Sequence, residues 1–304
     1  MELGVALPTS GALASPANIA RVAREAESIG YDALWTYERL LRPMAKLPQP
    51  QGPPERIPEI YRETYEPLET LSYVAALTER VKLGTSVVDA LLHPPVVLAR
   101  RYATLDRFSG GRVIAGIGQG WMPQEFETAN VPMRRKGAGM DEVVAAMRAC
   151  WGPDPVEYKG RFYRIEASEV NPKPVQASIP ILFGSMTPGG VERAARIADG
   201  LNPVALSEEL LLQLAGGFRE AARAHGRDAD ALPVVARANV PITREPLGEG
   251  RPYLGGSPAE IAEDVARLAG RGVDHVLFAS LDASDVEEEV GLLAELKAAI
   301  DARA

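Results

Sequence analysis

Apolar residues recur along this chain in two alternating patterns. Short, nearly continuous apolar runs, such as residues 2–7 and 113–117, predict strands that are buried on both faces. Longer segments place apolar residues three and four positions apart, as residues 19–29 do, and these predict helices with one buried face. Ser15 is a suitable N-cap for the first of these helices, and Gly30 is a suitable stop at its end.

Eight strand–helix units follow from this alternation. The strands are predicted at residues 2–7, 31–37, 81–88, 113–117, 179–183, 200–204, 233–240 and 273–279. The helices are predicted at 16–29, 67–78, 95–105, 141–151, 191–198, 208–225, 261–268 and 286–300, with a further short helix beginning near Pro123. Strands that alternate with helices form a parallel sheet, and eight such units favour an α/β fold of the closed (β/α)8 TIM barrel type over a doubly wound open sheet. We therefore expect residues 1–304 to form a single domain.

Two segments fall outside this rhythm. Residues 155–166 predict a small hairpin that turns at Lys159 and Gly160, inserted after the fourth unit. The segment from Leu40 to Glu63, after the second strand, is rich in proline and has no periodicity. A loop of this length in a compact domain is usually functional or disordered, so the segment is either a lid or an unstructured ornament.

Composition and charge narrow the classes of function. The chain has 304 residues, 46% of them apolar, and a formal net charge of −8, which argues against a nucleic-acid partner. No apolar run approaches the roughly 20 residues that cross a membrane, and the N-terminus lacks a signal peptide, so we expect a cytoplasmic protein without a membrane partner. The single Cys150 excludes an internal disulfide and is expected to be a buried small hydrophobe. Only three histidines are present and none clusters with acids, so we expect no metal site.

The carboxyl ends of the predicted strands carry the candidate chemistry, because barrels build their sites there. The second strand ends in Tyr37-Glu38-Arg39. Glu38 is either half of a surface ion pair with Arg39 or an acceptor for an N–H group of a ligand. The fourth strand runs into Gly118-Gln119-Gly120-Trp121, which is not a dinucleotide fingerprint because Trp121 stands where the third glycine is required. Trp121 is either a core residue or the wall of a site for a flat ring.

The fifth strand leads into a candidate phosphate site, residues 184–190. Thr187 suits the N-cap position of the following helix, and Pro188 suits its first turn. A helix N-terminus with unobstructed amides binds anions. Capping alone would not explain Gly189 and Gly190, since glycine in a helix costs up to ~1 kcal/mol relative to alanine. We therefore predict that the N–H groups of these two glycines bind a phosphate.

Several passages resemble the bacterial luciferase-like monooxygenase superfamily, and within it the coenzyme F420-dependent oxidoreductase branch. The resemblance covers nearly the whole chain and rests on the order and spacing of the passages, not on one motif. They are YDALWTYERL at 31–40, VKLGTSVVDALLHPPVVLARRYATLDRFSGGRVIAGIGQGW at 81–121, FYRI at 162–165, NPKPVQ at 171–176, PILFG at 180–184, GGVERAARIADG at 189–200 and GSPAEIAEDVARLAGRGVDHVLF at 256–278. Members of this superfamily are (β/α)8 barrels that bind FMN or the deazaflavin coenzyme F420 in the barrel mouth.

The resemblance implies roles for individual residues. Ser86 and Val87, which on their own belong to an ordinary strand with a polar end, would hold a non-prolyl cis peptide behind the cofactor ring. Glu38 matches an acidic residue near that ring. The full implied cofactor-binding set is Ser86, Val87, Gln119, Gly120, Trp121, Glu125, Gly184, Ser185, Met186, Thr187, Gly189 and Gly190.

Two positions depart from the family pattern. Deazaflavin reductases commonly have histidine after the acidic residue, where this chain has Arg39. Luciferase-type FMN enzymes often have arginine at the position of Gln119, and its absence favours the F420 branch. The basic run at 134–136 is either a solvated loop or a contact for the acidic tail of coenzyme F420.

The leading functional hypothesis is hydride transfer between coenzyme F420 and a small organic substrate, without a metal. Glu38 is the first candidate for proton handling, with Tyr37 or a bound water as the alternative. The other hypotheses are an FMN-dependent monooxygenase that uses dioxygen, and a flavin-binding barrel without catalysis. By resemblance to the family, the protein is expected to be a homodimer.

Overall fold

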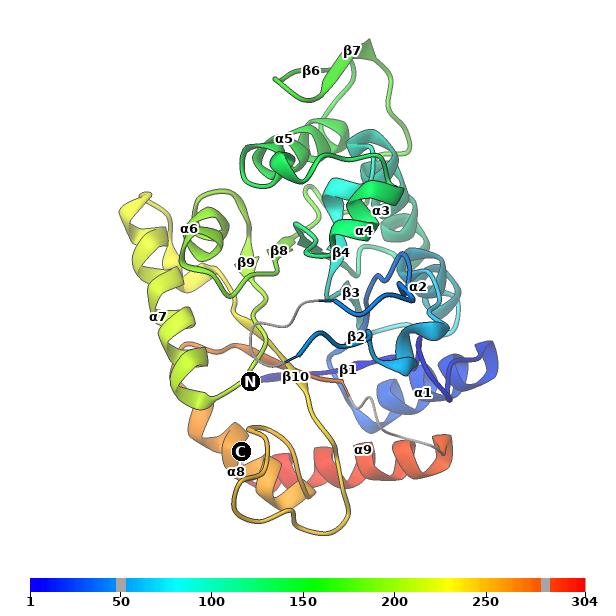
Figure 1. The fold of residues 1–304 in the computed structure, drawn as a ribbon, viewed down its shortest axis with the longest axis vertical. Coiled ribbons are helices and arrows are strands. Elements are labelled where there is room, and N and C mark those ends of the chain that lie inside the picture. Colours follow the sequence, from blue (N-terminus) through cyan, green and yellow to red (C-terminus); the bar gives the residue numbers. More distant parts are fainter. Residues whose placement is uncertain (48–52, 280–284, 304) are drawn as a thin grey trace.

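Eight parallel strands form a barrel in the computed structural model, which describes residues 1–47, 53–279 and 285–303. They are β1 Glu2–Ala6, β2 Ala33–Thr36, β3 Lys82–Thr85, β5 Val113–Gly118, β8 Ile181–Phe183, β9 Gly200–Leu201, β10 Val235–Asn239 and β11 His275–Ala279. Neighbouring strands pair in the order β10-β11-β1-β2-β3-β5-β8-β9 (Figure 1). Parallel bridges from Leu201 to Val234 and from Val204 to Arg237 bring β9 back to β10. The predicted (β/α)8 barrel is therefore confirmed.

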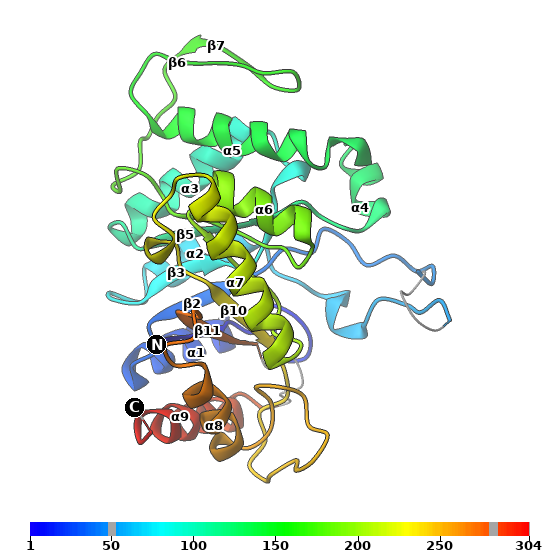
Figure 2. The ribbon, with the colours of Figure 1, turned by 90° about the vertical axis from the view of Figure 1, so that its left-hand side faces the viewer.

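Helices surround these strands (Figures 1 and 2). They are α1 Pro16–Ile29, α2 Pro67–Ala75, α3 Pro95–Ser109, α4 Pro123–Thr128, α5 Ala138–Trp151, α6 Pro188–Ile197, α7 Glu208–Ala224, α8 Pro258–Leu268 and α9 Val286–Asp301, with 3-10 turns η1 Glu59–Arg62, η2 Ala90–Leu92, η3 Met133–Arg135 and η4 Ala229–Ala231. Local capping sets the bounds of α1 as predicted. The Ser15 side chain accepts a hydrogen bond from the Asn18 N–H, and Gly30 ends the helix in the left-handed conformation with φ 101°.

Apolar side chains fill the barrel interior and the layer between strands and helices. Trp35 is fully buried inside the barrel, where it packs with Leu182 and Leu277. A β-carbon at Gly4 would lie 2.4 Å from Trp35 Nε1, and one at Gly84 would lie 2.3 Å from the Trp35 ring. These glycines therefore make room for the indole. Cys150 is buried, as predicted.

The third strand differs from its prediction. Residues 81–88 were expected to be one strand, but β3 ends at Thr85, and the short strand β4 Val88–Asp89 takes over the pairing with β5. The peptide bond between Ser86 and Val87, in the gap, is cis. The apolar pattern does not reveal this interruption because the residues on both sides of it are equally buried.

The predicted hairpin is present as β6 Val156–Lys159 and β7 Arg164–Ser168, projecting beyond α5 at the top of Figure 1. Its turn is longer than the predicted Lys159-Gly160 corner and spans residues 160–163. The Glu142 carboxylate of α5 accepts hydrogen bonds from the N–H groups of Arg161 and Phe162. A side chain outside the hairpin therefore shapes the turn, which is why the local sequence gave the wrong corner.

The Pro-rich segment is anchored at two buried residues, while most of its other described residues are exposed. Leu47 and Ile57 are buried against Met122, and Ser10 pairs with Thr64 at the end of the segment. Figure 2 shows the segment on the same side of the barrel as α4. The contact of Leu47 and Ile57 with Met122 favours the first of the two alternatives, a lid, which stays a prediction; residues 48–52 lie outside the described part of the chain.

Glu289 of α9 is a buried carboxyl group whose burial raises its pKa to about 7. Its Oε2 atom has no hydrogen-bond partner among the described residues. Because this pKa is raised above the ordinary 4.5, the folded chain keeps the proton up to about pH 7, and stability falls as pH rises between these values.

We therefore predict that Glu289→Gln gains stability relative to the parent protein as pH rises. Between pH 5 and pH 8 the difference in unfolding free energy should move by about 2–3 kcal/mol in favour of the variant. Urea unfolding at both pH values measures it. A difference that does not change with pH would contradict the prediction.

Candidate functional site

Polar groups converge where β2, β3, β4, β5 and β8 end, at the carboxyl end of the barrel. The peptide oxygen of Ser86 accepts a hydrogen bond from the Arg237 guanidinium, and Ser86 Oγ lies 2.6 Å from Asn202 Oδ1. The peptide oxygen of Val87 accepts from the Glu38 N–H at 3.0 Å. The cis peptide implied by the family resemblance is therefore held from three strand ends.

The Val87 side chain packs against two glycines of the neighbouring strand ends. A β-carbon at Gly118 would lie 2.7 Å from Val87 Cγ2, and one at Gly184 would lie 2.8 Å from Val87 Cγ1. Neither position can therefore carry a side chain while valine occupies position 87. The result is a wall made of backbone and one small side chain, which is the shape that a planar ring can lie against.

Buried Glu38 pairs with half-buried His93 beside this wall. Glu38 Oε1 lies 2.7 Å from His93 Nε2, and Glu38 Oε2 accepts the backbone N–H of Asp89 at 2.8 Å. Glu38 is 8% exposed, so it is not the surface ion pair with Arg39 that the sequence left open. His93, for which the sequence analysis proposed no functional role, is the partner of Glu38.

Asp89, at the end of β4, is a second buried carboxyl group in the mouth, with 9% exposure. Its pKa is raised to about 7, first by burial and then by the nearby carboxylates of Glu38 and Glu125. Arg39 and the Gly120 N–H act in the opposite direction but do not offset these effects. Asp89 can therefore change its protonation near neutral pH.

Arg39 links the mouth to the Pro-rich segment. Its Nη1 atom lies 3.1 Å from both carboxylate oxygens of Glu125, which also accepts the Leu40 N–H at 3.0 Å. The guanidinium lies over the rings of Tyr61 and Trp121, at 5.2 and 5.5 Å from their centroids. Trp121 is 52% exposed, which rules out its assignment to the core. Glu125, predicted as a cofactor ligand, is engaged with Arg39 in this structure.

Tyr37 is buried with its ring under the Arg237 guanidinium, 4.8 Å from the ring centroid. Burial raises the pKa of Tyr37, an effect that the Ser10 side chain opposes without offsetting it. Tyr37 lines a cavity of about 30 Å³ together with Thr9 and Glu289. Tyr37 is therefore less directly placed for chemistry in the mouth than Glu38 or Asp89.

The N-terminus of α6 has the predicted cap, but one of the two amides predicted to be free is not. Thr187 is the N-cap, and its side chain accepts the Gly190 N–H at 3.2 Å, so this amide is not free as predicted. A β-carbon at Gly190 would lie 1.9 Å from Ser185 Oγ, so close packing explains this glycine. Gly189 is exposed and has nothing within 4 Å of its would-be β-carbon. The Thr187 N–H lies 3.3 Å from Ser185 Oγ, so Gly189 is the more open of these positions.

The loop after α4 folds back over the end of β5. Gln119 Oε1 accepts the Gly137 N–H at 2.6 Å, and the Lys136 ammonium lies over the Phe126 ring. Arg135 lies over Phe162 and Tyr163 of the hairpin. The basic run at 134–136 is therefore partly anchored and is not a freely solvated loop.

Four residues of this mouth were not predicted as functional: Asp89, His93, Asn202 and Arg237. Asp89 could have been noticed as an acid at the end of a barrel strand. Asn202 and Arg237 contact Ser86 from 116 and 151 residues away, so no local pattern points to them.

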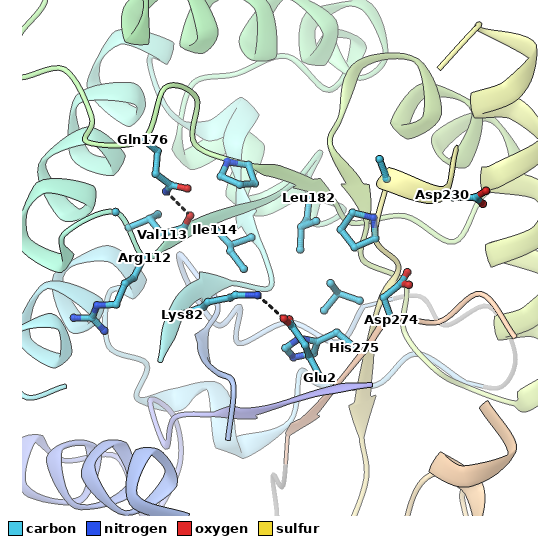
Figure 3. Close-up of a pocket in the computed structure, with 15 residues that line it drawn as sticks. Glu2, Lys82, Arg112, Val113, Ile114, Gln176, Leu182, Asp230, Asp274 and His275 are labelled. Carbon is cyan, nitrogen blue, oxygen red and sulfur yellow. Dashed lines mark hydrogen bonds and ion pairs between the residues drawn. The ribbon is translucent and has the colours of Figure 1, made fainter. Parts of the chain in front are cut away.

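The opposite end of the barrel holds a cavity of about 440 Å³ (Figure 3). Glu2, Lys82, Val113, Val235 and His275, which begin five of the strands, line it. Lys82 Nζ lies 2.5 Å from Glu2 Oε1, and this ion pair ties β3 to β1. Residues at this end of a barrel generally serve stability, so we place the candidate site at the carboxyl end.

Residues 1–47, 53–279 and 285–303 lack two further features. No group of three or more His, Cys, Asp or Glu side chains there is arranged to hold a metal ion. No helix in those ranges has the length and apolar character needed to span a membrane.

Known proteins resemble this chain in sequence and in fold. The chain is 29% identical over 222 residues to an F420-dependent glucose-6-phosphate dehydrogenase of Kineococcus radiotolerans, covering 70% of this chain and 61% of that protein. Its fold is similar to that of the monooxygenase RslO1 from Streptomyces bottropensis, with a TM-score of 0.80, 22% identity and 99% of both chains covered. It is also similar to the coenzyme F420-dependent tetrahydromethanopterin reductase of Methanopyrus kandleri, with a TM-score of 0.77, 20% identity and coverage of 96% and 97%. The model of the luciferase-like monooxygenase family matches residues 1–246, and the chain belongs to that family.

Proposed function

We propose that this protein is an oxidoreductase that transfers a hydride between coenzyme F420 and a small organic substrate at the carboxyl end of the barrel. The observation that carries the proposal is the wall formed by Val87, Gly118 and Gly184, which offers a planar ring a surface free of large side chains. Relatives named as F420-dependent enzymes support the choice of this cofactor.

The surroundings of the wall fit a phosphorylated deazaflavin. Ser86 and Val87 would lie behind the ring, and Gln119, Gly120 and Trp121 would line the ring and its ribityl chain. Ser185, Met186, Thr187 and the exposed N–H of Gly189 would take the phosphate, as a helix N-terminus does. When bound, coenzyme F420 supplies the hydride chemistry, while the protein supplies orientation and electrostatics.

We assign three roles to side chains of the mouth. The Glu38 carboxylate, which is positioned by His93, would accept a hydrogen bond from an N–H group of the ring or the substrate. Glu125 would act through Arg39, which it fixes against Trp121. The exposed face of Trp121 would then form part of the substrate wall.

Titration of the purified protein with coenzyme F420, FMN and riboflavin tests this proposal. We expect coenzyme F420 to bind at least 10-fold more tightly than FMN. Riboflavin, which lacks the phosphate of FMN, is the control for the anion site and should bind more weakly than FMN. Tighter binding of FMN would favour a monooxygenase of the same family. Binding of coenzyme F420 without single-turnover oxidation by any acceptor would favour a barrel without catalysis.

A further inference from the structure

We propose that Asp89 is the proton donor that accompanies hydride transfer in this mouth. The inference rests on the proposed function and adds a residue with a defined task to it. Three carboxyl groups, those of Glu38, Asp89 and Glu125, lie together at the ends of β2 and β4 and in α4. They are all at least nine-tenths buried.

Of these three carboxyl groups, two have a basic side chain within 4.0 Å and Asp89 has none among the described residues. Glu125 is paired with Arg39 at 3.1 Å, and Glu38 is paired with His93 at 2.7 Å. No lysine, arginine or histidine of the described residues lies within 4.0 Å of the Asp89 carboxylate. Three buried like charges cannot all be ionised without a matching cation, so the unpaired member is the one that holds a proton.

The charged groups that face Asp89 come from every element around it. Glu38 and Arg39 follow β2, Glu125 belongs to α4, and Lys136 follows η3. Burial lowers the pKa of Lys136, and the negative charge of Asp89 acts in the opposite direction. Burial, followed by the charges of Glu38 and Glu125, raises the pKa of Asp89 to about 7, in agreement with its lack of a basic side chain within 4.0 Å among the described residues.

Asp89 is also close to the space that a ring would occupy. A β-carbon at Gly118 would lie 3.2 Å from Asp89 Oδ1, and one at Gly120 would lie 3.4 Å from Asp89 Cγ. The Asp89 carboxyl group therefore lies against the backbone at the end of β5. Asp89 pairs with Gly118 in the β4–β5 register, which fixes its position relative to the wall.

The proton balance of the step is simple. Reduction of the substrate would take a hydride, with its two electrons, from the ring anion of the reduced cofactor, which is left oxidised, and one proton from Asp89. The O–H bond of the Asp89 carboxyl breaks, a new bond from hydrogen to the reduced substrate forms, and Asp89 is left as a carboxylate. Water from the solvent returns the proton before the next turnover. In the opposite direction the Asp89 carboxylate acts as the base.

Infrared titration of the cofactor-free protein tests the protonation of Asp89 independently of turnover. We expect carboxylic acid bands that disappear as pH rises through about 7, one of which is absent in Asp89→Asn. Glu289→Gln, which removes the other buried carboxyl group with a raised pKa, is the matched control and should remove a different band. An Asp89 carboxyl group that ionises below pH 5 would overturn the proposal whichever cofactor the protein uses.

Kinetics then test the transfer itself. Bound reduced cofactor is mixed with menadione, a quinone that takes up a hydride and a proton, and its single-turnover oxidation is followed from pH 5 to 9. The parent rate should fall as pH rises through about 7, because only protonated Asp89 donates. Asp89→Asn should be slower by 10²-fold or more and should lose this pH dependence. Glu289→Gln should keep both the rate and the profile.

The two proposals fail in distinguishable ways. Unchanged rate and pH profile in a folded Asp89→Asn protein would exclude Asp89 as donor while leaving F420 dependence in place. Asp89→Ser, a second uncharged replacement, guards against a fault specific to asparagine and should match it. Absence of turnover with either cofactor would instead remove the proposed function, and the role of Asp89 with it.

Discussion

Gly116→Ala is expected to prevent the barrel from folding. An alanine β-carbon at this position would lie 1.7 Å from the peptide oxygen of Thr85 and 2.8 Å from its carbonyl carbon. Both are backbone atoms at the end of β3, so no change of side-chain rotamer can relieve the overlap. The Thr85 hydroxyl also donates to the peptide oxygen of Gly116 at 2.7 Å, which holds the two strands together here. We expect a loss of more than about 4 kcal/mol, beyond the usual range for overpacking.

Soluble yield and thermal unfolding of the variant measure this effect. Gly216→Ala is the matched control, because Gly216 lies exposed within α7 and has nothing within 4 Å of its would-be β-carbon. That substitution should stabilise the protein by about 0.5–1 kcal/mol, since alanine is the better helix former. A Gly116→Ala protein with a parent-like melting temperature would show that β3 and β5 are not held this closely.

Glu125→Ala should cost about 3–5 kcal/mol, because it leaves the Arg39 charge buried without a partner. The Glu125 side chain is 1% exposed and that of Arg39 is 12% exposed, so water cannot replace the lost carboxylate. The Leu40 N–H would lose its acceptor as well. Arg39 would no longer be fixed over Tyr61 and Trp121, so the change should also loosen the joint between the Pro-rich segment and α4.

Chemical unfolding and Trp fluorescence follow both consequences. Glu127→Ala, an exposed site on the same helix, is the control and should change stability by less than about 0.5 kcal/mol. Adding Arg39→Met to Glu125→Leu should recover most of the lost stability, since a buried ion pair can often be replaced by apolar residues. If Glu125→Ala alone loses under 1 kcal/mol, the pair does not organise the mouth.

The architecture of this chain was predictable because each of its signals is local. Ser15 and Gly30 mark the ends of α1 within the helix sequence itself, and the apolar runs of β1 and β5 need no knowledge of their partners. Eight repeats of such units leave few ways to close the sheet. The third strand was drawn too long because its break at Ser86 depends on contacts with Arg237 and Asn202.

The candidate site was predictable only in outline. Glu38 was found because it ends a strand, but its partner His93 lies 55 residues further along the chain. The protonation of Asp89 depends on a count of charges from four segments, which exists only in the folded barrel. Gly190 was assigned to a ligand, whereas Ser185 in the folded loop accounts for it. Residue types indicated which strand ends could carry functional groups. Tertiary contacts determine which of these groups are paired and which are not.

The contact of Val87 with Gly118 and Gly184 also bears on how this mouth can evolve. Any side chain at position 118 or 184 would overlap Val87, because the two would-be β-carbons come within 2.7 and 2.8 Å of its methyl groups. A smaller residue at 87 would open a gap that only those positions could fill. The three residues come from three separate strand ends, yet a substitution at one of them restricts which residues fit at the other two. A lineage that reshapes this surface must alter them in concert.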